Sequence, residues 1–265
     1  MFRRSLVVFG LLLSFSVELY AGASLLLTEK RIVFSERQRS AEIIIKNNGD
    51  ETGRYEISIL EKEMMQDGRV VDTDSPQASI KKMLRYSPRR VSLQPGEAQT
   101  IRVALRKPKD LAPGEYRSHM RFTAMPIIQA NTASDTDEEL SLSTKMLLSY
   151  TIAVILRQGE LDAAASIDSA QVVKAESGYN LNFNINREGS RSLYGAIKVT
   201  SVDDPELVLA SLTGLGVYTP LAARQISIPL KLPAGGALPS QLRLQYIEDV
   251  AYGGDLNLES IVDAP

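Results

Sequence analysis

The stretch ELSLSTKMLLSYTIAVIL, residues 139–156, carries apolar side chains at almost every even position. Serine, threonine and lysine occupy most of the odd positions in its first half. Because side chains alternate between the two faces of a β-strand, this period of two predicts one long strand with an apolar face. Such a strand exceeds the usual length of ~5–6 residues. It follows a polar, acidic segment, so the sequence raises the question of what covers the apolar face.

The period of two recurs from residue 24 onward, for example in RSAEIIIKN, QTIRVALR and YRSHMRFTAM. Turn-forming residues separate these runs, as in NNGD, QPGE and LAPGE. Pro88 interrupts LRYSPRRVSL, which suits an edge strand or a strand that changes sheet. About seven strands with turns every ~8–12 residues predict a β-sandwich over residues 24–157.

A second series of strands follows the segment RQGE. The expected strands are 168–176, 179–188, 193–201, 206–212, 224–232 and 241–249. No helical period and no repeat of fixed length interrupts the pattern. We therefore expect an all-β chain with a second, smaller β-sandwich over residues 158–265.

Residues 1–23 predict a secretory signal peptide. Arg3 and Arg4 precede an apolar run, Leu6–Val17, that is shorter than the ~20 residues of a membrane span. The motif AGA ends at Ala23 and fits a cleavage site. We expect export to the periplasm with no membrane insertion after cleavage, and an uncleaved anchor is the alternative.

The amino-acid composition excludes several kinds of site and indicates the cellular compartment. The chain contains no cysteine, which excludes disulfides, thiolate nucleophiles and zinc–sulfur sites. An exported protein without disulfides suggests a bacterial envelope. Loss of the signal peptide leaves 28 of the 30 basic and 31 of the 32 acidic residues. This slightly acidic balance gives no reason to expect nucleic acid as a partner.

Catalytic chemistry is hard to find in the sequence. His119 is the only histidine, and no nucleophile motif or phosphate-binding loop is present. The acidic run 134–139 lacks the glycine and spacing of a calcium loop, so a solvated loop is the simpler interpretation. We expect no enzyme, no cofactor and no metal site. A carbohydrate hydrolase would need two convergent carboxylates, for which no motif is seen.

Basic residues gather in the first predicted domain, on the polar faces of its strands. They are Lys30, Arg31, Arg85, Arg89, Arg90, Arg102, Arg106, Arg117 and Arg121. One interpretation is a sheet face in contact with solvent. The other is an anion-binding surface, because the guanidinium group pairs with a carboxylate through two parallel hydrogen bonds. The pattern alone leaves both open.

Three segments resemble the periplasmic chaperones of the chaperone–usher pilus pathway: KRIVFSERQRSAEIIIKNNGDETGRYEISI, SPRRVSLQPGEAQTIRVALRKP and LAPGEYRSHMRF. SYTIAVILRQG is similar to the family's passage from the first domain into the second. The resemblance covers most of the mature chain and is weaker in the second domain. The missing disulfide suggests a branch other than the best-studied one.

The resemblance implies two immunoglobulin-like β-sandwiches set at an angle, with a cleft between them. It also implies an ATP-independent chaperone whose partners are pilin-like subunits and an outer-membrane usher. Such a chaperone lends a strand to an incomplete subunit, prevents its aggregation and delivers it to the usher for fibre assembly. The alternative is a structural surface or fimbrial subunit with two β-sandwiches, in which an N-terminal extension would be expected.

Strand donation would answer the question raised by residues 139–156. The expected donor residues are Leu140, Leu142, Thr144, Met146 and Leu148. Four buried aliphatic side chains would contribute ~6–12 kcal/mol before ordering costs. Ile152 and Val154 are expected to belong to the domain's own core instead.

In the family, basic residues of the cleft bind the subunit's terminal carboxylate. The resemblance assigns this role to Arg31, which precedes the apolar triplet IVF. The family's partner lysine lies four residues before the arginine that opens the second domain. Here that arginine is Arg157, and the position holds Ala153. Arg89 or Lys145 is then the second cation, or the anchor is a single arginine.

Overall fold

The computed structural model describes residues 24–126, 148–233 and 236–265. The expected signal peptide and the segment 127–147 lie outside these ranges. The described chain is all-β, as expected, with strands in four main sheets, one hairpin and two short 3-10 helices. None of its helices is long and apolar enough to cross a membrane.

The first sandwich consists of two sheets packed face to face. Its four-stranded sheet has the order β1 (Leu25–Leu27), β3 (Ser40–Asn47), β9 (Ala98–Leu105), β7 (Leu84–Ser87). Its five-stranded sheet has the order β2 (Arg31–Phe34), β11 (Ser149–Gln158), β10 (Gly114–Met125), β4 (Gly53–Leu60), β8 (Arg90–Leu93). Strand β1 belongs to the four-stranded sheet and β2 to the five-stranded one, so the chain crosses between the layers at residues 28–30.

The core of this sandwich follows the period of two. Ile43 and Ile45 from β3 share this core with Met120 and Phe122 from β10, and all four are fully buried. Pro88 lies between β7 and β8, which belong to different sheets. Both are also edge strands, so the two features expected at this proline, an edge strand and a change of sheet, occur together.

The second sandwich packs a three-stranded sheet on a four-stranded one. The first has the order β12 (Ala163–Ala175), β13 (Gly178–Gly189), β16 (Ala223–Leu230). The second has the order β15 (Val208–Val217), β14 (Leu193–Ser201), β17 (Gln241–Glu248), β18 (Asn257–Asp263). Strand β18 was not among the strands expected from the sequence.

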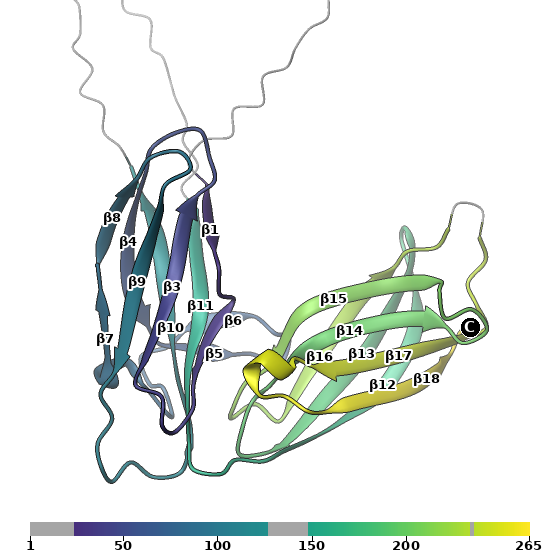
Figure 1. Ribbon diagram of the computed structural model, residues 1–265. Coiled ribbons are helices and arrows are strands. Elements are labelled where there is room, and N and C mark those ends of the chain that lie inside the picture. Colours follow the sequence, from purple (N-terminus) through teal and green to yellow (C-terminus); the bar gives the residue numbers. More distant parts are fainter. Residues whose placement is uncertain (1–23, 127–147, 234–235) are drawn as a thin grey trace, which may run out of the picture.

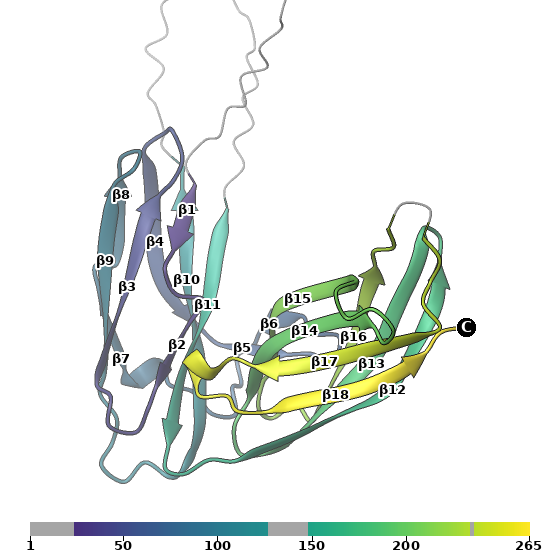
Figure 2. The same cartoon turned by 45° about the vertical axis from the view of Figure 1, so that its right-hand side comes forward.

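A small hairpin, β5 (Lys62–Met64) and β6 (Val70–Asp72), joins the two sandwiches. The backbone N–H of Gln225 donates to the carbonyl of Gln66 in its turn, at 2.8 Å. Gly68 has a φ of +83° and lies under the guanidinium group of Arg224, where a Cβ atom would collide with it. The long axes of the sandwiches are inclined to each other, with the hairpin between them (Figures 1 and 2). The short helices are η1 (Lys81–Met83) and η2 (Val250–Tyr252).

Candidate functional site

Arg31 opens strand β2 at the edge of the five-stranded sheet. Strand β2 runs parallel to β11, with Arg31 opposite Ala153. Ile32 and Phe34 point into the core, so alternation turns Arg31 outward. An outward arginine on an edge strand would normally be solvated, yet the residue is only 3% exposed because the second sandwich covers it.

Three tyrosines of the second sandwich surround this guanidinium group. Its Cζ atom lies 3.2 Å from the ring centre of Tyr194, 5.5 Å from that of Tyr218 and 5.6 Å from that of Tyr252. Aromatic rings at these distances attract a cation through their quadrupoles. The Nη2 atom also donates to the Tyr218 hydroxyl at 3.1 Å. The rings thus fix the direction of the Arg31 side chain without neutralising it.

Arg31 has unused hydrogen-bonding capacity. Its Nε and Nη1 atoms are buried and have no partner. None of the ion pairs among the described residues includes Arg31. A buried charge without a counter-ion is costly, so this group would gain from an incoming carboxylate.

A cavity of about 370 Å³ opens beside Arg31 and is lined by both sandwiches and the hairpin. Lys30, Arg31 and Lys62 contribute three cations to its lining, and no described carboxylate lines it. Tyr194 and Tyr218 form its wall on the side of the second sandwich. A cavity with this composition favours an anionic group that carries an apolar or peptide body.

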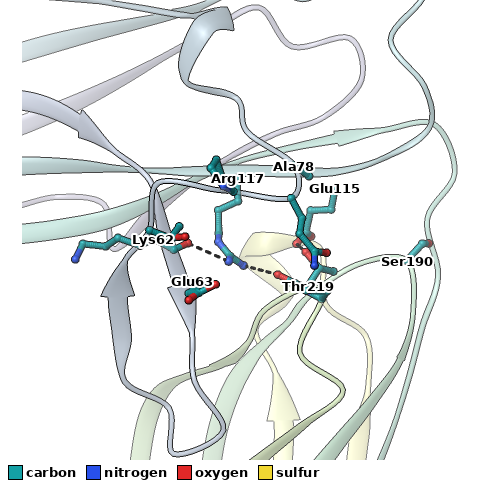
Figure 3. A pocket seen from close by; sticks show the side chains of 11 residues that line it. Lys62, Glu63, Ala78, Glu115, Arg117, Ser190 and Thr219 are labelled. Carbon is teal, nitrogen blue, oxygen red and sulfur yellow. Dashed lines mark hydrogen bonds between the residues drawn. The ribbon is translucent and has the colours of Figure 1, made fainter.

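Arg117 on β10 is a second buried arginine at the boundary between the sandwiches. Its Nη1 atom donates to the carbonyl of Thr219 at 3.2 Å, and its Nη2 atom to that of Lys62 at 3.5 Å (Figure 3). Its Cζ atom lies 4.2 Å from the ring centre of Tyr218. Burial lowers the pKa of Arg117 from its usual value. The backbone carbonyls hold this arginine in place between the hairpin and the second sandwich.

His119 lies two residues further along β10 and is also buried. Its ring meets that of Tyr218 edge to face, with centres 6.1 Å apart. Burial, reinforced by the nearby charges of Arg117 and Lys62, lowers the pKa of His119 to about 3. The imidazole is therefore neutral near pH 7 and adds no charge to the cleft.

The polar face of the first sandwich thus divides into two parts. Arg102 and Arg90 are largely exposed and form surface ion pairs with Glu42 and Glu56. Arg31 and Arg117 are instead covered by the second sandwich. The solvated interpretation describes the first part, whereas the arginines of the second part are withdrawn from water.

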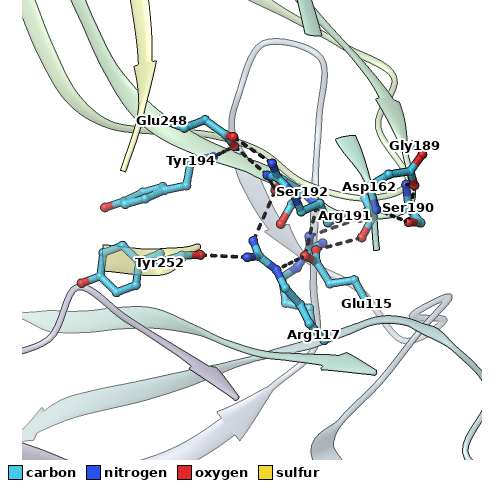
Figure 4. A network of polar contacts seen from close by, with 12 residues as sticks. Glu115, Arg117, Asp162, Gly189, Ser190, Arg191, Ser192, Tyr194, Glu248 and Tyr252 are labelled. Carbon is cyan, nitrogen blue, oxygen red and sulfur yellow. Dashed lines mark hydrogen bonds and ion pairs between the residues drawn. The ribbon is translucent and has the colours of Figure 1, made fainter. Parts of the chain in front are cut away.

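A polar network fixes how the sandwiches meet. The buried carboxylate of Glu115 accepts hydrogen bonds from Nε of Arg157 at 3.2 Å and from the backbone N–H of Ser192 at 3.1 Å. Arg157 also donates through Nη1 to the carbonyl of Tyr252 at 2.8 Å. Nearby, the buried Arg191 forms two hydrogen bonds with Glu248 (Figure 4). These contacts keep the tyrosines in place over Arg31.

Strand β11 has an open edge next to the cavity. It pairs with β10 from Ser149 to Gln158, whereas β2 covers its other edge only from Ala153 to Leu156. Among the described residues, no strand pairs with the β2 side of β11 between Ser149 and Ile152. Leu148 lies just before this edge and is 49% exposed. Unpaired backbone groups beside an apolar side chain can accept another strand.

The described residues contain only part of the expected donor row. Leu140, Leu142, Thr144 and Met146, together with Lys145, lie outside the described ranges. Ile152 and Val154 belong to the core of the first sandwich, as expected. The remaining donor residue, Leu148, is the one at the exposed start of β11.

The structure separates Arg89 from Arg31. Arg89 is exposed, lies between β7 and β8, and stands 5.5 Å from the ring centre of Tyr86. Strand β8 and strand β2 form the two opposite edges of the five-stranded sheet. Arg89 therefore does not share the cavity that Arg31 lines. Ala153 carries no charge. Lys62, whose side chain is mostly buried, is a cation that does line this cavity.

Sequence reasoning missed the three tyrosines and Lys62. Each tyrosine stands within two residues of a glycine, a weak signal that has no unique meaning. Their role depends on contacts between residues far apart in the chain. No group of three or more possible metal-ligating side chains occurs among the described residues.

No protein-family model matches the chain, and none of the curated proteins does. Similar solved structures include the E. coli chaperone DraB, at 15% identity, with 90% of this chain and 96% of that chain covered and a TM-score of 0.49. The Salmonella enterica SafA pilin in complex with the SafB chaperone gives 14% identity, coverage of 91% and 99%, and a TM-score of 0.49.

A third similar structure is the CsuC–CsuE chaperone–tip adhesion subunit complex from archaic chaperone–usher Csu pili of Acinetobacter baumannii. Its identity is 9%, its coverage 92% and 100%, and its TM-score 0.47. All three structures contain a chaperone, and in two of them it is bound to a pilin or to a tip adhesion subunit.

Proposed function

We propose that this protein is a periplasmic, ATP-independent chaperone that binds pilin-like subunits. It would lend the first part of the strand that ends in β11 to an incomplete subunit and prevent that subunit's aggregation. It would then deliver the subunit to an outer-membrane usher for fibre assembly. The proposal combines the resemblance in sequence with the chemistry of the cleft.

One observation carries the proposal: an open strand edge lies beside a buried, unneutralised arginine. The open edge of β11 ends at Ala153, and Arg31 stands directly opposite that residue on β2. An extended polypeptide added along the edge would reach Arg31 with its last residue. Backbone hydrogen bonds would supply affinity, and the carboxylate would set the register.

The apolar face of the strand fits the same role. Leu148, Tyr150 and Ile152 share one face with the core residues that follow. A subunit that lacks a strand exposes both a groove and unpaired edges, which promote aggregation. Residues 140–148 would fill such a groove with alternate side chains while pairing with its edges.

Co-purification tests this function. The full-length gene is expressed with its neighbouring genes, and complexes are isolated from periplasmic extract and identified by mass spectrometry. We expect a one-to-one complex with a small, exported, β-rich protein that is lost in Arg31→Ala. The matched control is Arg102→Ala, which removes an exposed arginine from the other sheet of the same sandwich.

Two results would contradict the proposal. Recovery of the protein alone, in every genetic context tried, would argue against a client. Recovery only as a polymer of itself would favour the alternative, a structural surface or fimbrial subunit. Equal loss of the complex in Arg31→Ala and Arg102→Ala would remove the assigned role of Arg31 in the cleft.

A further inference from the structure

Lys62 and Asp72 form an ion pair across the β5–β6 hairpin. They face each other in its register, and the Lys62 Nζ atom lies 2.6 Å from Oδ1 of Asp72. The two partners differ sharply in exposure, since the Lys62 side chain is 15% exposed and that of Asp72 is 68% exposed. Lys62 lines the same cavity as Arg31, whereas Asp72 does not.

This asymmetry decides which half of the pair is easily released. Water would hydrate the Asp72 carboxylate almost fully once it left Lys62, because that carboxylate already lies at the surface. Lys62 is largely withdrawn from water and needs a counter-ion at all times. Release of Asp72 to water therefore costs little, which leaves Lys62 open to another carboxylate.

The surrounding charges explain why Lys62 carries a counter-ion in the empty cleft. Arg31 and His119 both line the cavity, and His119 is neutral. Arg117 lies against the ring of Tyr218, which also lines the cavity. Arg121 is the other cation near Asp72 on this face. Without Asp72, the hairpin would add a third unpaired cation to two buried arginines.

We propose that Asp72 is an exchangeable counter-ion, which the terminal carboxylate of an extended client polypeptide displaces so that Arg31 and Lys62 bind that carboxylate together. The inference rests on the proposed function and adds a binding residue and an internal competitor to it. The Nε and Nη1 atoms of Arg31 supply the unused donors, and Lys62 supplies the second charge. The hairpin thereby becomes part of the binding site.

The two halves of the pair have opposite expected effects. Lys62→Gln removes a charge-assisted hydrogen bond and should weaken carboxylate binding roughly 10-fold or more. Asp72→Asn removes the competitor and should tighten binding about 2–5-fold, the range of an exposed ion pair. Lys62→Arg keeps the charge and should stay near the affinity of the unaltered protein. Lys30→Gln is the comparison variant, because Lys30 lines the same cavity but is exposed, and it should weaken binding less than Lys62→Gln does.

The test uses an N-acetylated octapeptide of alternating leucine and threonine, made once with a free C-terminal carboxylate and once as the C-terminal amide. Its dissociation constant is measured for the full mature chain and for each variant, with thermal unfolding as a check of folding. We expect the effects of Lys62→Gln and Asp72→Asn with the free acid only. The amide should bind weakly and equally to all of the variants.

The outcomes separate this inference from the proposed function. Weaker binding in Arg31→Ala with no change in Lys62→Gln and Asp72→Asn would overturn the exchange and leave the Arg31 anchor intact. No binding of the free acid, or equal binding of acid and amide, would overturn both. An equal loss of affinity in Lys62→Gln and Lys30→Gln would mean that Lys62 acts only through the net charge of the cavity. That result would overturn the exchange.

Discussion

The guanidinium group of Arg31 lies against the ring of Tyr194, with its Cζ atom 3.2 Å from the ring centre. The two residues belong to different sandwiches and are more than 160 positions apart in the sequence. The second sandwich therefore determines where a side chain of the first one points. Its contribution to the site is to orient a cation, while the charge itself comes from the first sandwich.

Replacement of this ring should reduce the affinity for a carboxylate client. In Tyr194→Leu, Arg31 loses a desolvated cation–π contact of about 1–2 kcal/mol, so binding should weaken about 5–30-fold. Tyr194→Phe retains the ring and should behave like the unaltered protein. Dissociation constants for the two variants check the prediction, and equal losses in both would assign the effect to the hydroxyl group instead.

A charge on the exposed start of β11 should block client capture without unfolding the protein. Leu148 is 49% exposed, so Leu148→Glu should leave the free energy of unfolding almost unchanged. In a complex, however, the new carboxylate would enter an apolar groove without a partner. Capture of the client in co-purification should be lost, and more completely when Met146→Glu is added.

The matched control is Ile44→Glu, at an apolar position that is 45% exposed on the other sheet of the same sandwich. This control should capture the client normally. If Leu148→Glu also captured it normally, donation through this part of the strand would be refuted.

Removal of the Glu115 carboxylate should destabilise the contact between the sandwiches. Glu115→Gln leaves the largely buried guanidinium of Arg157 without its counter-ion, a change that costs about 3–5 kcal/mol at buried pairs. Urea unfolding should show this loss. In comparison, Glu42→Gln breaks an exposed pair with Arg102 and should cost less than about 1 kcal/mol.

The pH dependence of the free energy of unfolding should report on His119, the only histidine of the chain. Its pKa is lowered to about 3 in the folded state, against about 6.5 in the unfolded state. Between these values the unfolded chain binds the extra proton, so stability should fall as the pH drops from about 6.5 towards 3. The whole difference between the two pKa values corresponds to about 3–5 kcal/mol of folding stability.

Stability measured by urea unfolding between pH 7 and pH 5 checks this prediction, because most carboxylates titrate below that range. His119→Gln should flatten the dependence. A profile that is already flat in the unaltered protein would mean that the histidine becomes charged without unfolding the chain.

Removal of the Tyr246 hydroxyl should not lower the stability of the protein, in contrast to the losses expected for the changes above. The hydroxyl is buried without a hydrogen-bond partner, and burial raises its pKa. Tyr246→Phe removes this unsatisfied group and keeps the ring in the core, so stability should be unchanged or higher by up to about 1 kcal/mol. Thermal unfolding measures the change, and a loss of more than about 1 kcal/mol would reveal an unseen partner.

Local alternation was enough to predict much of the first sandwich. The rows that contain Ile43 and Phe122 are buried where the period of two expects them, because each strand must bury one face. Pro88 marks the change of sheet because its ring supplies no N–H group for a ladder. These features depend on neighbours within a few residues along the chain.

Contacts between the sandwiches were beyond such reasoning. Arg117 and His119 look like members of a solvated face, and only the approach of Tyr218, about 100 residues later, removes them from water. The strands of the β5–β6 hairpin have only 3 residues each, too few for an alternating pattern to stand out. The ion pair of Lys62 and the open edge of β11 likewise become visible only when the strands are paired in three dimensions.

The parallel pairing of β2 with β11 joins residues that are about 120 positions apart. Contacts of such long sequence separation form slowly, because a large loop must close before they contribute. The strand that would be lent to a client is thus also the last strand of its own domain to be made. Under the proposed function, a chain in which β11 has not yet been made would have no strand to lend to a client.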